Sequence, residues 1–499
     1  MTHAKLSPVT LPDFGESTVE PTLGPEIFAT RHQRLLKAMK KAGFDALVIY
    51  GDREHLANIA WASGYDPRFE EALYVVLPGR TPSLFAGNEG FPYAETAAGK
   101  FERVLWQHLS LMGQPRDKDK SLHKLLKAAG LEKGMRIGLA GWKGYEAENG
   151  DVDDQWFETP HYLVKALKRF GKVANAAQIF MNPVDGLRAI NEAEQLARFE
   201  FAATLSSNAV RCFIFGARPD MTEYDACRNM KLNGFPLSTH INMCAGPLAK
   251  YGLPSPSMRK LCKGDPIVVG HGLMGALNCR AGFLVKDENG LPEGAKDYVS
   301  KLVAPYFEAA AAWYGAVGIG VKGGDIYDTA MAGISEPFFG IGLNPGHLIH
   351  LDEWLHSPIK NESKKKLASG MALQCDIIPA TGTVYFTSNI EDGIALADEK
   401  LRGELAQKFP EMWVRVQKRR AFMQDVLVKY HKEEPAGPLG EKVVLTKAKF
   451  GSVPKYYIHT TQDAAVGYEL QKMMVKNNGT IRKTFEMPTS HLPFVVQPQ

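Results

Sequence analysis

Several features that mark other protein classes are missing from this 499-residue sequence. The six cysteines contain no C-x-x-C pair and all lie in the middle of the chain. Because disulfide scaffolds belong to small oxidised proteins, we expect reduced thiols. No apolar run reaches the roughly 18 residues of a membrane span, and the first residues lack the basic start and apolar core of a signal peptide. We therefore expect a cytoplasmic protein that has no contact with membranes.

A strong charge of either sign is also missing. The formal net charge is +4, and no block of five or more basic residues occurs. The nearest approach, KNESKKK at 360–366, is typical of a solvated turn. We therefore expect no nucleic-acid partner. The hydrophobic content of 45% is that of an ordinary globular protein, and the length suffices for two or three domains.

The first 183 residues alternate between helical and strand patterns. Residues 26–43 place apolar side chains at helical spacing and end at a glycine, and the buried strand DALVIYGD follows. Further helix and strand patterns continue to MNPVDGLR, whose Pro and Gly mark a boundary near residue 184. The sequence predicts an α/β domain over 1–183.

A second domain, predicted over 184–432, contains the densest group of titratable residues. Residues 338–398 read as three strands joined by Gly and Pro turns. If these strands are neighbours, alternation directs about half of their side chains to one face. We predict catalytic roles for four residues there: His347, His350, Asp376 and Glu391. The two carboxylates would act as general acid and base or as anchors for a substrate amine, and one imidazole as a proton shuttle.

Three further residues are candidates for binding substrate in the same pocket. Glu353 follows His347 and His350 in the same strand-like run, whereas His240 and His271 lie on earlier strand patterns. A lone histidine on a strand is more often a satisfied structural residue, so both readings stay open for His240 and His271.

Three blocks in this region resemble a known family. They are G-I-G-L followed by a turn rich in His and acidic residues, then S-G-M-A-L-Q-C-D-I-I-P, then N-I-E-D-G-I-A-L. Their order and spacing resemble the pita-bread superfamily of creatinase, prolidases, and proline-specific and methionine aminopeptidases. The resemblance implies an α/β N-terminal domain followed by an α+β pita-bread domain.

Metallopeptidases of that superfamily hold two divalent ions with two Asp, one His and two Glu. Carried over to this sequence, the two Asp positions fall on Gly270 and Ala281, and the His position on Phe339. Only Asp376 and Glu391 stand where the resemblance implies acidic ligands. Two carboxylates do not form a dinuclear cage, so we expect no family-type metal and no cofactor. An improvised site that combines His271, His347 or His350 with these two carboxylates stays open as the alternative.

Within the family that the sequence resembles, creatinase works without a metal ion and uses a His base on the strand before the Gly-Asp turn. The corresponding position here is Leu253. Creatinase-like proteins also place an Arg so that it reaches the substrate of a partner subunit, and Arg68 stands at that position. The resemblance therefore implies a homodimer, and a solvated loop arginine is the alternative reading of Arg68.

Residues 433–499 form a third predicted segment, a short α/β extension that resembles the end of an α/β-hydrolase of the plant esterase type. That resemblance implies Asp463 and His491 as triad partners, but G-x-S-x-G is missing from the chain. We interpret residues 433–499 as an inert segment that docks on the main domain or on a partner. A triad completed by Ser335 or Ser388 is the alternative.

Three functions follow from these observations. The first is a metal-independent, creatinase-like hydrolase that cleaves a C–N bond in a small polar substrate. The second is a pita-bread pseudoenzyme that binds a ligand or peptide. The third is an aminopeptidase or dipeptidase with an atypical metal set. The first is favoured, because titratable groups placed in an apolar block cost stability and are seldom without a role.

Overall fold

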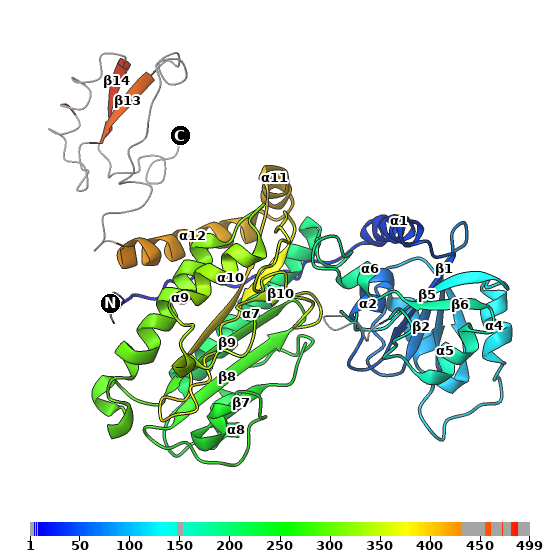
Figure 1. The fold of residues 1–499 in the computed structure, drawn as a ribbon, viewed down its shortest axis with the longest axis horizontal. Helices are drawn as coiled ribbons and strands as arrows, with labels where there is room; N and C mark the ends of the chain where they lie inside the picture. Colours follow the sequence, from blue (N-terminus) through cyan, green and yellow to red (C-terminus); the bar gives the residue numbers. More distant parts are fainter. Residues whose placement is uncertain are drawn as a thin grey trace. The chain divides into compact units, whose positions relative to one another are not determined.

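The computed structural model describes residues 4, 6, 8–146, 153–431, 455–460, 472 and 481–487 (Figure 1). The chain divides into two compact units, Met1–Tyr430 and His431–Gln499. In the second unit, strands β13 (Lys455–Thr460) and β14 (Ile481–Met487) pair in parallel. Asp463 and His491 lie outside the described residues, so their predicted roles stay predictions.

The amino-terminal part of the first unit is built on a mixed six-stranded sheet with the order β4-β3-β2-β1-β5-β6. Its central strands are buried along their whole length, as expected where helices cover both faces. The strands are β1 (Ala46–Gly51), β2 (Ala72–Val76), β3 (Ser83–Ala86), β4 (Glu102–Leu105), β5 (Met135–Ala140) and β6 (Gly171–Asn175). The helices are α1 (Pro25–Ala42), α2 (Ala57–Ser63), α3 (Gly90–Tyr93), α4 (Leu122–Ala128), α5 (His161–Leu167) and α6 (Gln178–Met181).

Helix α1 shows how the sequence specifies this part. Pro25 opens the helix, and Gly43 ends it in the left-handed conformation with its N–H bonded to the carbonyls of Met39 and Lys40. The buried positions Phe28, Arg31, Leu35 and Met39 recur every three or four residues and face the core. The predicted helix at 26–43 is confirmed.

The following part of the first unit is an antiparallel sheet with the order β10-β11-β12-β9-β8-β7. The strands are β7 (Asn242–Ala245), β8 (Pro266–Leu273), β9 (Ala276–Phe283), β10 (His347–Leu348), β11 (Ala372–Cys375) and β12 (Asn389–Ala395). The last three are neighbours, which confirms the expectation that the strands between residues 338 and 398 lie side by side.

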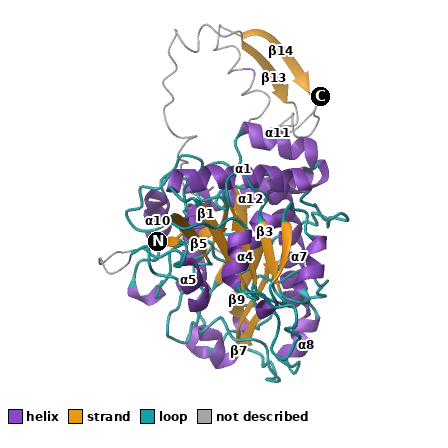
Figure 2. Ribbon diagram, turned by 90° about the vertical axis from the view of Figure 1, so that its right-hand side faces the viewer, coloured by secondary structure: helices purple, strands orange, loops and turns teal. Residues whose placement is uncertain are grey.

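Helices pack against this sheet. Helix α7 lies along β8 and β9 (Figure 1), and α9 contacts β11 and α10. Figure 2 draws the helices in purple and the strands in orange. The helices are α7 (Ala193–Gly216), α8 (Glu223–Arg228), α9 (Ala304–Ala316), α10 (Gly323–Met331), α11 (Glu399–Lys408) and α12 (Pro410–His431). The two predicted helix pairs against antiparallel strands are therefore present.

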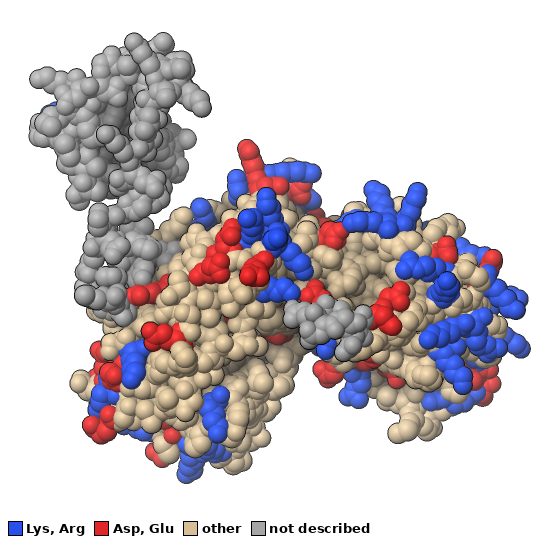
Figure 3. Space-filling model, in the orientation of Figure 1, with Lys and Arg blue, Asp and Glu red and all other residues tan. Residues whose placement is uncertain are grey.

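Charged side chains on the face drawn in Figure 3 include Lys and Arg gathered over α4 and α5. Among the described residues, no helix is both long enough and apolar enough to cross a membrane. Three of the predicted catalytic residues, His347, Asp376 and Glu391, are buried instead, and they lie at the end of the second sheet formed by β10, β11 and β12.

Candidate functional site

The centre of the candidate site is the imidazole of His347, the first residue of β10. Gly346 precedes it with φ of +127°, and a Cβ there would lie 2.6 Å from the carbonyl oxygen of Gln374. Only glycine lets the chain approach β11 this closely. His347 is fully buried, and its Nδ1 lies 3.1 Å from the carbonyl oxygen of Leu348, so Nε2 is the atom left for chemistry.

Two neighbouring strands bring carboxylates to this nitrogen. Asp376 directly follows β11, and Glu391 is the third residue of β12. Nε2 of His347 lies 3.8 Å from Oε1 of Glu391 and 3.9 Å from Oδ2 of Asp376. Both carboxylates are buried. The structure therefore brings three of the four predicted catalytic residues together.

The third carboxylate comes from the loop after β10. Oε1 of Glu353 lies 3.3 Å from Nε2 of His347, and the Glu353 side chain is 28% exposed, so it is the carboxylate of the cluster nearest to solvent. Trp354 stacks on the imidazole with a centroid distance of 4.0 Å and an interplanar angle of 18°. We call His347, Glu353, Asp376 and Glu391 the acidic cluster.

The acidic cluster shifts the proton affinities of its members. Burial alone would lower the pKa of His347, but the adjacent carboxylates of Glu353, Glu391 and Asp376 outweigh it and raise this pKa to about 10. Burial and the charge of Glu391 raise the pKa of Asp376 well above its usual range. Burial also raises the pKa of Glu391, although His347 opposes this shift. His347 is therefore an imidazolium at neutral pH, and it lies beside two carboxyl groups, those of Asp376 and Glu391, whose pKa values are raised.

Among the described residues, three polar atoms of the acidic cluster have no hydrogen-bond partner of suitable geometry, although Nε2 of His347 lies within ion-pair distance of Glu353. They are Nε2 of His347, Oδ1 of Asp376 and Oε1 of Glu391. An unsatisfied buried polar atom costs about 1–3 kcal/mol, so an arrangement of three such atoms points to a ligand that completes them.

The donors do not fit the two-metal cage that the family resemblance implies. On β8 and β9 the register places Gly270 opposite Cys279, and Cys279 lies opposite Glu391 on β12. A glycine and a thiol therefore stand on the strands where the resemblance implies two Asp. The ligand atoms of His347, Glu353 and Glu391 all lie within 4.8 Å of one another, a spacing that suits at most one small cation.

The positions counted from the family resemblance can be located in the structure. Gly270 of β8 pairs with Cys279 of β9, whereas Ala281 pairs with Val268 of β8 and with Asn389 of β12. Phe339 is buried in the hydrophobic core, and the imidazole among the carboxylates is that of His347, eight residues later. Gly270, Ala281 and Phe339 offer no metal-ligating side chain.

His350, the fourth predicted catalytic residue, lies in a different environment. It is also fully buried, but its Nδ1 lies 3.4 Å from Nε of Arg188, and the ring of Phe199 meets it edge-on at 5.2 Å. Burial and the charges of Arg188, Arg31 and Arg34 lower its pKa well below the usual value. The structure does not bring His350 into the acidic cluster, so a proton shuttle at this position has no geometric support.

The other predicted binding residues lie elsewhere. His271 alternates with Gly270 along β8, so its imidazole is on the opposite face of the sheet, and burial lowers its pKa to about 4. Nε2 of His240 contacts the carbonyl oxygen of Leu253 at 2.9 Å, and the Leu253 side chain is exposed. Nη1 of Arg68 donates to the carbonyl of Leu237 at 3.1 Å. Only Glu353 of the binding group belongs to the cluster, and the role of Arg68 toward a partner subunit stays a prediction.

The two cysteines beside the cluster are poor nucleophiles. Burial and Glu391 raise the pKa of Cys279, and burial and Asp376 raise that of Cys375, both well above the usual thiol value. Protonated thiols are weak nucleophiles, so both residues act in packing.

Sequence reasoning missed Trp354 and Arg188. Trp354 is half-exposed and adjoins Glu353, so a tryptophan inside a turn rich in acidic residues was the available signal. Arg188 interrupts the apolar run Leu187 to Ile190 just before α7, and a lone cation in such a run indicates a buried partner.

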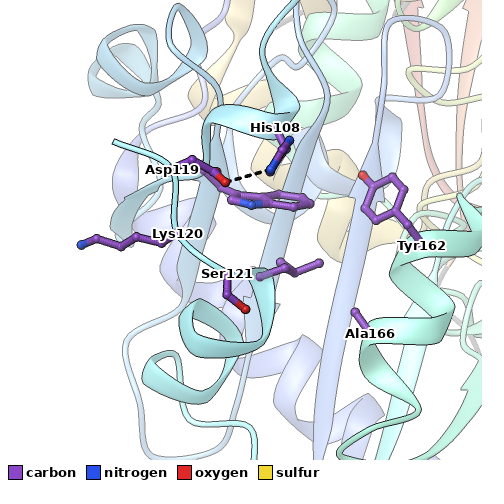
Figure 4. A pocket seen from close by; sticks show the side chains of 8 residues that line it. His108, Asp119, Lys120, Ser121, Tyr162 and Ala166 are labelled. Carbon is purple, nitrogen blue, oxygen red and sulfur yellow. Dashed lines mark ion pairs between the residues drawn. The ribbon is translucent and has the colours of Figure 1, made fainter. Parts of the chain in front are cut away.

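A separate hollow lies on the amino-terminal sheet domain (Figure 4). The hollow has a volume of about 510 Å³ and opens to solvent. On one side, Nε2 of His108 and Oδ2 of Asp119 form an ion pair at 2.8 Å. None of its lining residues belongs to the acidic cluster. Its lining consists of Trp106, His108, Asp119, Lys120, Ser121, Leu122, Tyr162 and Ala166.

Comparison with known proteins supports the fold. Residues 31–180 match the profile of the Creatinase/Prolidase N-terminal domain. The structure superposes on an Xaa-Pro dipeptidase from Bacillus anthracis with a TM-score of 0.56 at 17% identity, covering 74% of this chain and 96% of that chain. A recombinant prolidase from Thermococcus sibiricus superposes with a TM-score of 0.58 at 18% identity, covering 76% of this chain and 96% of that chain. An X-Pro aminopeptidase from Thermotoga maritima superposes with a TM-score of 0.55 at 16% identity, covering 74% of this chain and 95% of that chain.

A second likeness is short. Over 66 residues, or 13% of its length, the chain is 38% identical to two chloroplastic methylesterases of Arabidopsis thaliana, methylesterase 11 and methylesterase 13. The chain spans only 17% and 15% of the length of these curated relatives. The profile match and the superpositions carry the assignment: the chain shares the fold of these dipeptidase, prolidase and aminopeptidase structures, and its residues 31–180 match the Creatinase/Prolidase N-terminal domain.

Proposed function

We propose that the protein is a hydrolase that cleaves a C–N bond in a small polar substrate, and that it works through its own side chains without a metal ion. The observation that carries this proposal is the acidic cluster, in which one imidazolium nitrogen lies 3.3 to 3.9 Å from three carboxylates. The solved structures that share the fold are named as dipeptidases, prolidases and an aminopeptidase, which act on C–N bonds.

The charges of the acidic cluster suggest the kind of substrate. The carboxylates of the cluster repel one another and so raise the pKa values of Asp376 and Glu391, and a ligand that brings positive charge would relieve this repulsion. Glu353, the most exposed of the three, is placed to receive an amine or amidine group first. A small substrate with a cationic nitrogen next to the scissile C–N bond meets both requirements.

The reaction follows from the proton affinities. The ionised member of the Asp376–Glu391 pair takes a proton from water as the water oxygen bonds to the substrate carbon. The C–N bond then breaks, and the departing nitrogen takes the proton of the His347 imidazolium. A pKa of about 10 suits this step, because it is close to that of the amine being released. Water and substrate give an acid and an amine, and transfer of the proton from the new carboxyl group back to the His347 imidazole restores the starting protonation.

The test uses the full chain purified without added metal. Turnover is measured on amidines, ureas, N-substituted glycines and Xaa-Pro dipeptides, with and without a chelator. We expect activity that the chelator leaves intact and that Asp376→Asn or Glu391→Gln lowers by about 10²- to 10⁴-fold. Asp119→Asn is the matched control, because it removes a carboxylate paired with a histidine outside the cluster. Loss of activity to the chelator would overturn the metal-independent mechanism.

A single-metal peptidase is the second candidate. It is favoured by the spacing of the ligand atoms of His347, Glu353 and Glu391, which all lie within 4.8 Å of one another. A bound ion would supply a polarising charge for water or for a carbonyl oxygen. Elemental analysis of the purified protein separates the two candidates. One equivalent of Mn, Co or Zn, retained through dialysis, would favour this second candidate.

A further inference from the structure

Arg188 is a buried cation that the proposed reaction does not use. Its side chain is 1% exposed, although it lies on the segment that leads into α7. Nη1 donates to Oδ1 of Asn58 at 2.7 Å, Nη2 pairs with the carboxylate of Asp352, and Nε faces Nδ1 of His350 at 3.4 Å. Burying an unpaired guanidinium is very costly, so these partners are required for the fold to hold it there.

The partners of Arg188 belong to two different parts of the first unit. Asn58 lies on α2 in the amino-terminal domain, where its Nδ2 donates to the carbonyl of Gly141 at 2.6 Å. His350 and Asp352 lie on the loop after β10. Arg188 therefore joins the amino-terminal domain to that loop.

This loop carries Glu353 into the acidic cluster. Glu353 directly follows Asp352, and His347 precedes His350 by three residues. The loop is closed by two backbone bonds, from Leu348 N to the carbonyl of His356 at 2.7 Å and from Leu355 N to that of Leu348 at 2.9 Å. Between these bonds, Arg188, which is not part of the loop, contacts Asp352 and His350. Its guanidinium therefore restricts the position of the next residue, Glu353, relative to Nε2 of His347.

We propose that Arg188 is the positioning residue of the site, and that it sets the place of the Glu353 carboxylate and of the His347 imidazole through Asp352 and His350. Arg188 touches neither carboxylate of the Asp376–Glu391 pair in the described contacts, so it acts through the loop. This inference rests on the proposed function for its effect on turnover, but its structural half stands without it.

Arginine is suited to this role and lysine only in part. The planar guanidinium reaches three acceptors in three directions at once, whereas an ammonium is a point charge that would keep the pairing with Asp352 and lose the directed contacts. Arg188→Lys should therefore keep the buried charge balanced while loosening the loop. Arg188→Met removes the charge and leaves the carboxylate of Asp352 without its partner.

The experiment compares these two variants in the full chain by hydrogen exchange of the peptide that covers residues 347–356 and by steady-state kinetics on the best substrate of the panel. We expect Arg188→Met to lose exchange protection in this segment and to lower kcat by about 100-fold with a much smaller change in KM, since small misplacements of reacting groups have effects of this size. Arg188→Lys should recover part of both.

Arg415→Lys and Arg415→Met are the matched controls, because Arg415 on α12 is also a buried arginine held by a carboxylate, that of Glu200 at 2.8 Å, and among the described ion pairs it has none with residues 347–356. Equal loss of kcat in the Arg415 and Arg188 series, or unchanged exchange of 347–356 in Arg188→Met, would overturn the proposal. If the wild-type chain turns over no substrate, the function fails, while the exchange result still decides whether Arg188 positions the loop. If Arg188→Met does not fold, Asp352→Asn carries the same test from the other side of the contact.

Discussion

His347 and His350 stand three residues apart, both fully buried, yet their surroundings give them opposite proton affinities. Carboxylates from β11, β12 and the loop surround His347 and raise its pKa to about 10. Burial and arginines from α1 and the segment before α7 lower the pKa of His350. Burial alone would lower both, so the sign of the neighbouring charges decides which imidazole carries a proton at neutral pH. The first can donate a proton to a leaving group, and the second is a neutral part of the scaffold.

The largest expected effect is on turnover. His347→Gln removes the proposed proton donor and should lower kcat by about 10²- to 10⁴-fold. His350→Gln keeps a polar group that can face Arg188 and should lower kcat by less than about tenfold, through the loop alone. Steady-state kinetics on the two purified variants measure both. Equal losses would show that the two imidazoles share one role and would remove the contrast between them.

The next effect is on stability as a function of pH. His347 has a folded pKa above its unfolded value of about 6.5, so its stabilising contribution is complete below pH 6.5 and disappears as pH rises through about 10. The wild-type chain should therefore exceed His347→Gln in unfolding free energy most clearly near pH 6, by about 3–5 kcal/mol, the size expected for a broken buried pair. The gap should narrow toward pH 10.

The sign reverses at His350. Its folded pKa is lowered, so the unfolded chain binds a proton below pH 6.5 that the folded chain refuses, and the wild-type chain loses stability as pH falls through this value. His350→Gln should be free of that loss. Urea unfolding of both variants and the wild type between pH 5 and 10 gives the comparison. Parallel curves for the two variants would contradict the assigned protonation states.

The smallest effect concerns the aromatic neighbour of the charged imidazole. Trp354 stacks face-on against His347, a geometry that favours a cationic ring, whereas Phe199 meets His350 by its edge. Trp354→Leu should destabilise the fold by about 1 kcal/mol and lower the pKa of His347 slightly. Thermal unfolding near pH 7 and near pH 10 checks this, because the loss should shrink once the imidazole is neutral. An equal loss at both pH values would reduce the stacking to ordinary packing.

The sequence was a good guide where chemistry lies on adjacent strands. Asp376 and Glu391 could be picked out because short strands between Gly and Pro turns bring neighbouring segments together, and the order β10-β11-β12 bears this out. The helix at 26–43 followed from spacing and from Gly43 in the same way.

The remaining features depend on contacts that are distant in sequence. Arg188 meets His350 across 162 residues, and no local pattern reveals that pairing. The pairing of Gly270 with Cys279 depends on the register of β8 and β9, which the turn between the strands sets. The face of His271 was likewise set by alternation along β8, which could be read only after the register was known.

The most direct test of the central claim is an NMR titration of the histidine ring protons in the folded chain, with His347→Gln and His350→Gln used to assign the two signals. The protonated state of His347 predicts a signal that titrates near pH 10, while that of His350 stays in the neutral form from pH 6 upward. If His347 instead lost its proton near pH 6.5 like a solvent-exposed imidazole, it would not be the proton donor at neutral pH and the proposed reaction would be wrong.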